Sequence, residues 1–427
     1  ASGNANTSKT VVVANPSGTV PAFNMIQTLS DGAQRTTLAF AGLGMMTGNL
    51  AAQSFFPPGK VADYTGFQYL RDNDPDNMGH NTDFLTRVAN NVLYILTDAQ
   101  IAQLKQLAGT QLSAVQTYGY QRFTLMQAFR QLVDGTGPAT SLNATNVKAA
   151  SRALYLVDGQ ISFDRAVLYA NVFNTLDATQ KAYLDGMKGK GFNSWPAISD
   201  AQVNSKLTGL AQGTKVLVMT YASDLYSWYA GSLDADIYFC PERHGTYFGS
   251  FYMKDAPAVG VPGYSISEQL TATAGTALSD ASKGYVNASQ ASAISGLVST
   301  QKANLYAGAT NIVQLRTDIA LLLRGLRTTL ANSDAVKAKV LELSGLYGDL
   351  DGENNYHYAS VFAQVYASLS SAQKTQLTDL RHTILSGTYA GGTPFDFTSA
   401  STPYLYSDPI TDPSSLTPYL SAASNLF

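Results

Sequence analysis

The sequence predicts a mainly α-helical protein, built of two tandem helical-hairpin units with an irregular or short-β aromatic insert between them and extended termini. Three observations lead to this prediction: a recurring helix-start signal, a set of further matches at nearly constant spacing, and ends rich in proline or β-branched residues. The 427 residues are enough for two or three domains, and a hydrophobic share of 45% is ordinary for a globular chain.

The helix-start signal is a Leu followed four residues later by a Gln, at 96–100, 176–180, 297–301 and 369–373. In three copies the residue after Leu is a good N-cap, and Gln stands at the capping-box position. The third copy has Val298 there, which offers no capping oxygen. The leading Leu can pack as a hydrophobic staple, and apolar residues follow at helical spacing. We expect each signal to start a helix that pairs with the preceding helix, with these residues in the first turn: Gln100, Gln180, Gln301 and Gln373.

Other matches indicate a tandem duplication. Arg122 matches Arg316, Val147 matches Val336, and Tyr169 matches Tyr358. The offsets stay nearly constant (316 − 122 = 194; 336 − 147 = 189; 358 − 169 = 189), as expected for a duplication with small insertions. The alternative is chance similarity among Ala- and Leu-rich helices. The duplicated parts run from roughly 80 to 190 and from roughly 280 to 390.

The chain therefore divides into five parts. Residues 1–24 form an extended segment, in which a β-branched run at 10–14 is followed by a turn signal at 15–18. Helical unit 1 covers 25–190 and helical unit 2 covers 281–390. The Gly/Tyr-rich insert at 191–280 begins with a stretch, 215–221, that suits a helix or a strand. A Pro/Tyr-rich, non-helical tail occupies 391–427.

Composition limits the location and the partners. Charged residues are only 13%, so the polar surface consists mainly of uncharged side chains, which suits an extracellular or periplasmic protein. The first residues, from Ala1, resemble a mature end left after processing at a small-residue site, so we expect a secreted protein. A net charge of −3 indicates no nucleic-acid partner, and no apolar run is long enough for a transmembrane segment.

The signal at 96–100, Leu-Thr-Asp-Ala-Gln, resembles the motif of the LTxxQ family of bacterial periplasmic stress proteins, of the Spy and CpxP type. The copies at 176–180, 297–301 and 369–373 keep Leu and Gln but replace Thr. Members of that family carry two such motifs on a helical cradle and act as ATP-independent chaperones or envelope-stress modulators. The resemblance covers four short motifs and implies a periplasmic helical protein.

Two acidic stretches have oxygen-bearing side chains at alternate positions, as calcium loops do. Neither matches an EF-hand, because the glycine and the closing ligand are misplaced. The alternative is that Asp, Asn and Gly serve as turn and cap residues. The predicted calcium ligands are Asp72, Asp74, Asp76 and Asp83 in the first stretch, and Asp349, Asp351, Glu353 and Asn355 in the second.

A second candidate metal site is Cys240 with His244, whose spacing would suit a soft metal or a Cys–His nucleophile pair. The alternative is a buried Cys in an aromatic insert, because Pro241 and Gly245 make this segment a turn. No nucleotide-binding, hydrolase or zinc-protease motif occurs in the sequence, so we do not expect an enzyme.

The predicted function is that of an extracytoplasmic structural, self-assembling protein, a surface or filament subunit. The low charge and the 25 Tyr residues, which are typical of interfaces, favour it. We expect a homo-oligomer or filament joined through the extended termini. The alternative is a Spy-like periplasmic chaperone, or a ligand- or metal-binding module.

Overall fold

The protein is described by a computed structural model that covers residues 12–15, 18–21, 29, 31–47, 64–67, 70, 74, 76, 82–231, 275–386 and 413–427. This part of the chain is mainly helical, which confirms the predicted fold class. Its main helices are α2 (Asp31–Thr47), α5 (Thr82–Ile95), α6 (Asp98–Asp134), α7 (Ala144–Phe173), α8 (Ala178–Met187), α9 (Asp200–Val203), α10 (Gln212–Ala230), α14 (Ala288–Lys302), α15 (Ile312–Gly325), α16 (Ser333–Ser368), α17 (Ser371–Ser386) and α18 (Pro413–Ala422).

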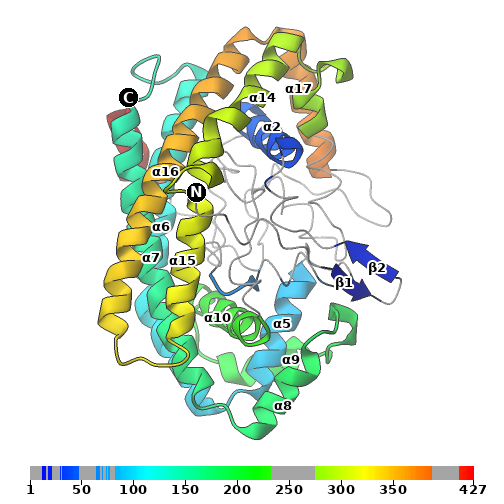
Figure 1. The fold of residues 1–427 in the computed structure, drawn as a ribbon, viewed down its shortest axis with the longest axis vertical. Coiled ribbons are helices and arrows are strands. Elements are labelled where there is room, and N and C mark those ends of the chain that lie inside the picture. The colour runs from blue at the N-terminus through cyan, green and yellow to red at the C-terminus, as the bar shows by residue number, and fades with distance from the viewer. Residues whose placement is uncertain are drawn as a thin grey trace.

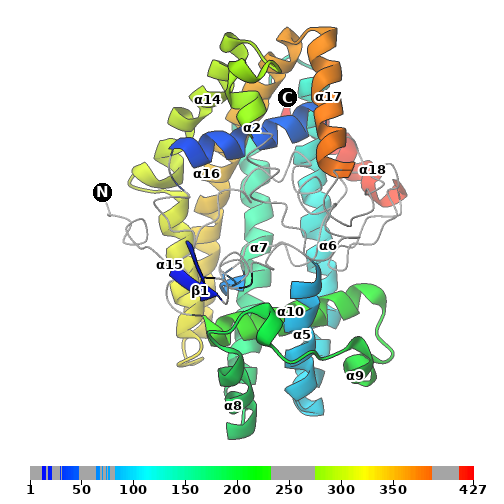
Figure 2. The ribbon, with the colours of Figure 1, turned by 90° about the vertical axis from the view of Figure 1, so that its right-hand side faces the viewer.

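The helices α6, α7, α15 and α16 run side by side along the long axis of the molecule (Figure 1). Helices α2, α14 and α17 gather at one end, and α5, α8, α9 and α10 gather at the other (Figure 2). The described buried side chains form one continuous hydrophobic core, which includes Leu43, Phe84, Phe129 and Trp228. The stretch 215–221, which suited helix or strand, is helical and belongs to α10.

Capping boxes start the predicted helices. In α6, the Thr97 hydroxyl accepts from the Gln100 backbone N–H, and the Gln100 side chain accepts from the Thr97 backbone N–H. Asp177 and Gln180 form the same box at α8. Ser370 and Gln373 form it at α17, so three of the four predicted helix starts are confirmed.

The prediction for Gln301 is wrong. Gln301 lies near the end of α14, whose capping box is made by Asn287 and Gln290. The reason is chemical, because Val298 has no oxygen to accept the orphan N–H groups of a first turn, whereas Asn287 has one. Val286, which is buried, takes the place of the leading Leu.

The two ends of the described chain make contacts within their own chain. Strand β1 (Val12–Asn15) pairs antiparallel with β2 (Gly18–Pro21), so the predicted strand finds its partner in its own chain. At the other end, α18 and the short helix η10 (Ala423–Leu426) pack on α6 and α7. The expected non-helical tail is therefore wrong for these residues. Helix formation lets Ala423 and Leu426 be buried, while residues 391–412 lie outside the described part.

Equivalent contacts relate the two duplicated repeats. Gln100 donates to the carbonyl and hydroxyl of Thr175, and Gln290 donates to the carbonyl and hydroxyl of Ser368. The two amides of each repeat also bond to each other: Gln180 donates to Gln100 over 2.7 Å, and Gln373 donates to Gln290 over 2.8 Å. Each repeat is thus closed by a clasp of two Gln side chains, defined as Gln100–Gln180 and Gln290–Gln373.

The long helices α7 and α16 cross at glycines. A Cβ atom on Gly159 would lie 2.5 Å from Ser344 Oγ, and one on Gly352 would lie 2.7 Å from Ser151 Cβ. These contacts are equivalent with an offset of 193 residues (352 − 159 = 193; 344 − 151 = 193). The predicted matches of Val147 with Val336 and of Tyr169 with Tyr358 imply an offset of 189. This offset is therefore wrong by about one helical turn.

Each repeat places its first helix on the other repeat. We define the first repeat as residues 31–207 and the second as residues 212–386. Helix α10 opens the second repeat but packs on α5 and α6, where Tyr221 donates to Gln111 over 2.8 Å. Helix α2 opens the first repeat but packs mainly on α14, α16 and α17, where Gln301 donates to Gln34 over 2.8 Å.

The ends of these two exchanged helices are held alike. Arg130 of α6 donates to the Gly44 carbonyl in the last turn of α2, over 3.3 Å. Arg324 of α15 donates over the same distance to the Gly231 carbonyl at the end of α10. Cations are favourable near helix C-termini, where carbonyl groups lack partners. The two repeats are consequently interlocked rather than placed side by side.

The repeats differ at one point along the helix that follows the first clasp residue. Gln111 matches Gln301 with an offset of 190, whereas Arg122 matches Arg316 with an offset of 194. The second repeat thus has four additional residues between these positions. Where α6 is continuous, the second repeat has α14, a π-helical turn (Ala303–Ala307) and then α15.

Candidate functional site

A cluster of buried polar side chains lies where α6, α7, α15 and α16 meet, and we name it the polar centre. It contains two carboxylates, two guanidinium groups and four phenols, each with less than a tenth of its surface exposed. One Asp and one Arg come from each repeat, so the cluster is balanced in charge. Its members are Tyr64, Tyr118, Arg122, Tyr155, Asp158, Arg316, Tyr347 and Asp351.

The carboxylates of the polar centre accept hydrogen bonds from hydroxyl groups. Tyr155 of α7 donates to Asp351 of α16 over 2.6 Å, which joins the two repeats. Asp158 accepts from Ser162, one turn along the same helix, over 3.0 Å. The rings of Tyr155 and Tyr347 lie 4.5 Å apart, so the phenols pack on each other as well as on the charges. The Tyr155–Asp351 bond thus gives one buried charge a partner across the interface between the repeats, and Ser162 gives the other a partner within its own helix.

Burial raises the pKa of Tyr64, Tyr118 and Tyr347 in the polar centre. The pKa of Tyr118 is raised first by burial and then by the negative charge of Asp158, while Arg122 lowers it in part. Burial likewise raises the pKa of Tyr347, against a lowering effect of Arg316. These hydroxyl groups therefore remain donors over the physiological pH range. A buried charge is costly to leave without a partner, so this arrangement favours one relative placement of the two repeats.

The first predicted calcium stretch is engaged with backbone groups. Asp74 Oδ2 accepts from the Phe192 N–H over 3.0 Å, and Asp76 Oδ2 accepts from the Asn193 N–H over 2.8 Å. Both carboxylates thus cap the short helix η3 (Phe192–Ser194), in agreement with the turn-and-cap alternative. Asp72 and the side chain of Asp83 lie outside the described residues.

The second predicted calcium stretch, 349–355, is not a loop, which corrects the expectation. It lies within α16, where the carboxylates face α7: Asp349 forms an ion pair with Arg152, and Glu353 forms one with Lys148 at 3.7 Å. Asp351 belongs to the polar centre, and Asn355 donates to the Asp351 carbonyl over 2.8 Å. Glycines that would signal a turn here allow the close crossing with α7.

Among the residues that the structure describes, no group of three or more His, Cys, Asp or Glu side chains is arranged to hold a metal ion. Cys240 and His244 fall outside the described ranges. The partners of the described carboxylates favour the turn-and-cap alternative over calcium binding, and a melting experiment with added calcium tests this.

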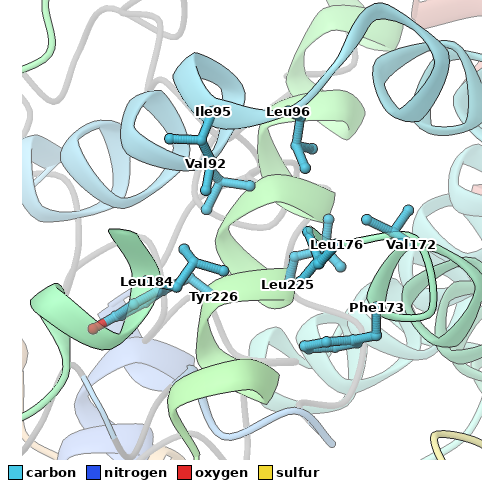
Figure 3. A pocket seen from close by; sticks show the side chains of 9 residues that line it. All are labelled: Val92, Ile95, Leu96, Val172, Phe173, Leu176, Leu184, Leu225 and Tyr226. Atoms are coloured by element: carbon cyan, nitrogen blue, oxygen red, sulfur yellow. The ribbon is translucent and has the colours of Figure 1, made fainter. Parts of the chain in front are cut away.

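A small apolar pocket lies between α5, α10 and the turn from α7 to α8 (Figure 3). The space inside is about that of one water molecule. Its walls are Val92, Ile95, Leu96, Val172, Phe173, Leu176, Leu184, Leu225 and Tyr226. We interpret this pocket as a packing gap at the helix starts of the first repeat, because its lining offers almost no polar group to orient a ligand.

Two sequence signals that point to these features were missed. The Asp-Gly pairs at 158–159 and 351–352 recur with the offset of 193 and mark the polar centre. In addition, residues 48–72 resemble residues 231–255 with an offset of 183, pairing Phe56 with Phe239 and Tyr64 with Tyr247. The sequence of the part expected to be an insert therefore resembles the segment before α5, so the similarity between the two halves of the sequence extends further than predicted.

Comparison with known protein families, with curated proteins and with solved structures finds no match to this chain. The resemblance to the LTxxQ family therefore stays a prediction. No described helix is both long and apolar enough to cross a membrane.

Proposed function

We propose that this protein is an extracytoplasmic structural subunit, in which the two interlocked repeats form one rigid building block of a self-associating assembly. The observation that carries the proposal is the exchange of α2 and α10 between the repeats. Because each repeat packs against a helix that belongs to the other repeat, the two repeats cannot separate without breaking buried contacts at several places. Such resistance suits a structural subunit that must keep its shape.

The use of polar side chains supports the same proposal. In the described residues, the carboxylates singled out from the sequence bind backbone groups, phenols or cations of the same molecule. They join elements of the fold. The low charge, 13%, also supports the proposal, because two surfaces with few charges meet at a small desolvation cost.

The contacts of the described terminal residues favour a route of assembly other than the expected one. Residues 413–427 are docked on α6 and α7 of their own chain, and β1 is paired with β2. We therefore propose that the contacts between copies lie on the outer helical surface and do not depend on the C-terminal segment.

The test is to purify the full chain and follow its mass by light scattering over a wide concentration range, with negative-stain imaging of the same samples. We expect regular particles heavier than the 45.5 kDa chain, which dissociate on dilution. Removal of residues 413–427 serves as the comparison, and should leave these particles in place. A monomer at every concentration would contradict the proposal.

The alternative is an LTxxQ-type chaperone, favoured by the capping boxes and Gln clasps that close both repeats. The assay is suppression of aggregation of an unfolded client by the monomeric fraction, without ATP. Suppression at near-stoichiometric amounts, together with the absence of large particles, would favour this alternative over the structural subunit.

A further inference from the structure

The surface between the two repeats is nearly symmetric at its centre. Gly159 meets Ser344, and Gly352 meets the equivalent Ser151. Tyr155 and Gly348 are themselves equivalent (348 − 155 = 193) and touch each other, so the approximate twofold axis passes between them. Two equivalent surfaces that meet around a twofold axis are the arrangement of a dimer.

The charges around this axis break the symmetry. Lys148 and Arg152 of the first repeat face Glu353 and Asp349 of the second, with the Lys148–Glu353 nitrogen–oxygen distance at 3.7 Å. With the offset of 193, the second repeat has Leu341 where the first has Lys148, and Gly345 where the first has Arg152. In the same way, the first repeat has Gln160 at the position of Glu353 and Leu156 at the position of Asp349. The cations are therefore found only on the first repeat and the anions only on the second.

Pairing of two first repeats would lose both interactions. Lys148 would then face Gln160, and Arg152 would face Leu156, each without an anion. Two Tyr155 side chains would also meet at the axis, where the close approach depends on Gly348: a Cβ there would lie 2.9 Å from the Tyr155 Cβ. The surface thus favours a second repeat as the partner of a first repeat and disfavours a like copy.

The exchanged segments extend the same surface. Helix α10 and the C-terminal segment, residues 413–427, belong to the second half of the chain but pack on the first repeat. Helix α2 belongs to the first half and packs on the second repeat. A cut between the halves would leave each holding a helix that the other needs.

We propose that the first and second repeats bind each other as the two different subunits of a heterodimer do. The peptide link between them is dispensable once the protein has folded, and the Lys148–Glu353 and Arg152–Asp349 pairs select this pairing. This inference goes beyond the proposed function and holds whether or not whole chains assemble.

The experiment begins with the full chain carrying a site for a specific protease at 208–211, where Thr208 and Gly209 are exposed. The folded protein is cut, then passed over a size-exclusion column in native buffer and in denaturant. We expect the halves to elute together in native buffer and apart in denaturant. Separation or precipitation of the halves after cutting in native buffer would overturn the proposal.

Selectivity is tested in the cut protein by charge reversal. K148E with R152E should speed dissociation of the halves about tenfold, because two attractions become repulsions. Adding D349K with E353K should bring the rate back to within about threefold of the starting protein. K339E is the matched control, since Lys339 is exposed and pairs with Glu342 on its own helix, and it should leave the rate unchanged. Equal rates for the reversed and the control variants would overturn the assigned selectivity.

Discussion

Replacement of Gln180 by Met tests the Gln clasp directly. The Gln180 side chain donates to the Ile95 carbonyl over 2.9 Å and to the Gln100 side chain over 2.7 Å, and it accepts from the Asp177 N–H over 2.9 Å. Met has a similar length but none of these bonds. Gln180 Oε1 also accepts from Gln100 Nε2 over 3.4 Å. The loss therefore removes four hydrogen bonds, each worth about 1 kcal/mol net, and leaves the Ile95 carbonyl without this donor. We expect Q180M to lower the free energy of unfolding by about 2–4 kcal/mol.

The assay is urea unfolding followed by far-ultraviolet circular dichroism, with the midpoint and slope fitted together. Q202M is the matched control, because Gln202 completes the capping box of α9 but is exposed. Q202M should lower the free energy of unfolding only by the contribution of a helix cap, about 0.5–1 kcal/mol. If Q180M and Q202M are destabilised equally, the clasp contributes nothing beyond a helix cap, and the argument that it closes the repeat is wrong.

Other predictions address packing, docking, ionisation and metal binding. G352A should destabilise the fold by about 1–3 kcal/mol, because its Cβ would lie 2.7 Å from Ser151 Cβ. G296A, at an exposed helix position, should stabilise the fold by about 0.5–1 kcal/mol. Both changes are measured by urea unfolding. L426A should cost about 2–3 kcal/mol and leave the helical signal intact, and an unchanged midpoint would mean that the C-terminal segment does not dock. Burial raises the pKa of Tyr183 to about 12, against about 10 for an unfolded phenol. The contribution of this tyrosine to the free energy of unfolding should therefore persist below pH 10 and be lost between about pH 10 and 12. In Y183F, the free energy of unfolding should depend less on pH in that range. Added calcium should leave the melting temperature unchanged, because the described acidic side chains already have partners, and a rise that a chelator reverses would contradict this.

The sequence was informative where the signal is local. Thr97, Asp177 and Ser370 cap helices because the capping oxygen and the orphan N–H groups lie within four residues of each other. The same logic explains the failure at Val298, which has no such oxygen. The strand at 12–15 was predictable for the same reason, since its partner strand begins three residues later.

The alignment of the repeats failed for a different reason. A shift of four residues along a helix turns a side chain by only about 40°, so an alignment that is wrong by one turn still matches apolar faces. The offset of 189 preserved this pattern for Tyr169 and Tyr358, whereas the Asp-Gly pairs and the contacts of Gly159 and Gly352 give 193. The acidic stretch 349–355 was wrongly predicted to be a loop, because Asp and Gly, which are typical of turns, also occur where one helix crosses another closely.

The partners of α2 and α10 were beyond prediction from local patterns. Both helices have apolar faces that fit many surfaces. Nothing in residues 31–47 indicates that the main partners of α2 lie some 250 to 340 residues further along the chain. The polar centre was missed for a related reason. Its side chains come from separate parts of the sequence and acquire their common environment only when the two repeats meet.

The exchange of first helices also dictates the order in which the chain can finish folding. Helix α2 emerges from the ribosome before its main partners, and α17, one of them, ends 339 residues later (386 − 47 = 339). At common rates of synthesis this interval lasts roughly 20–70 s. Throughout it, apolar side chains such as Phe40, Leu43 and Met45, which are buried in the final structure, have no complete surface to cover them. Among the described helices, α2 is therefore made before its partners, and its packing is completed only after α17 has been synthesised.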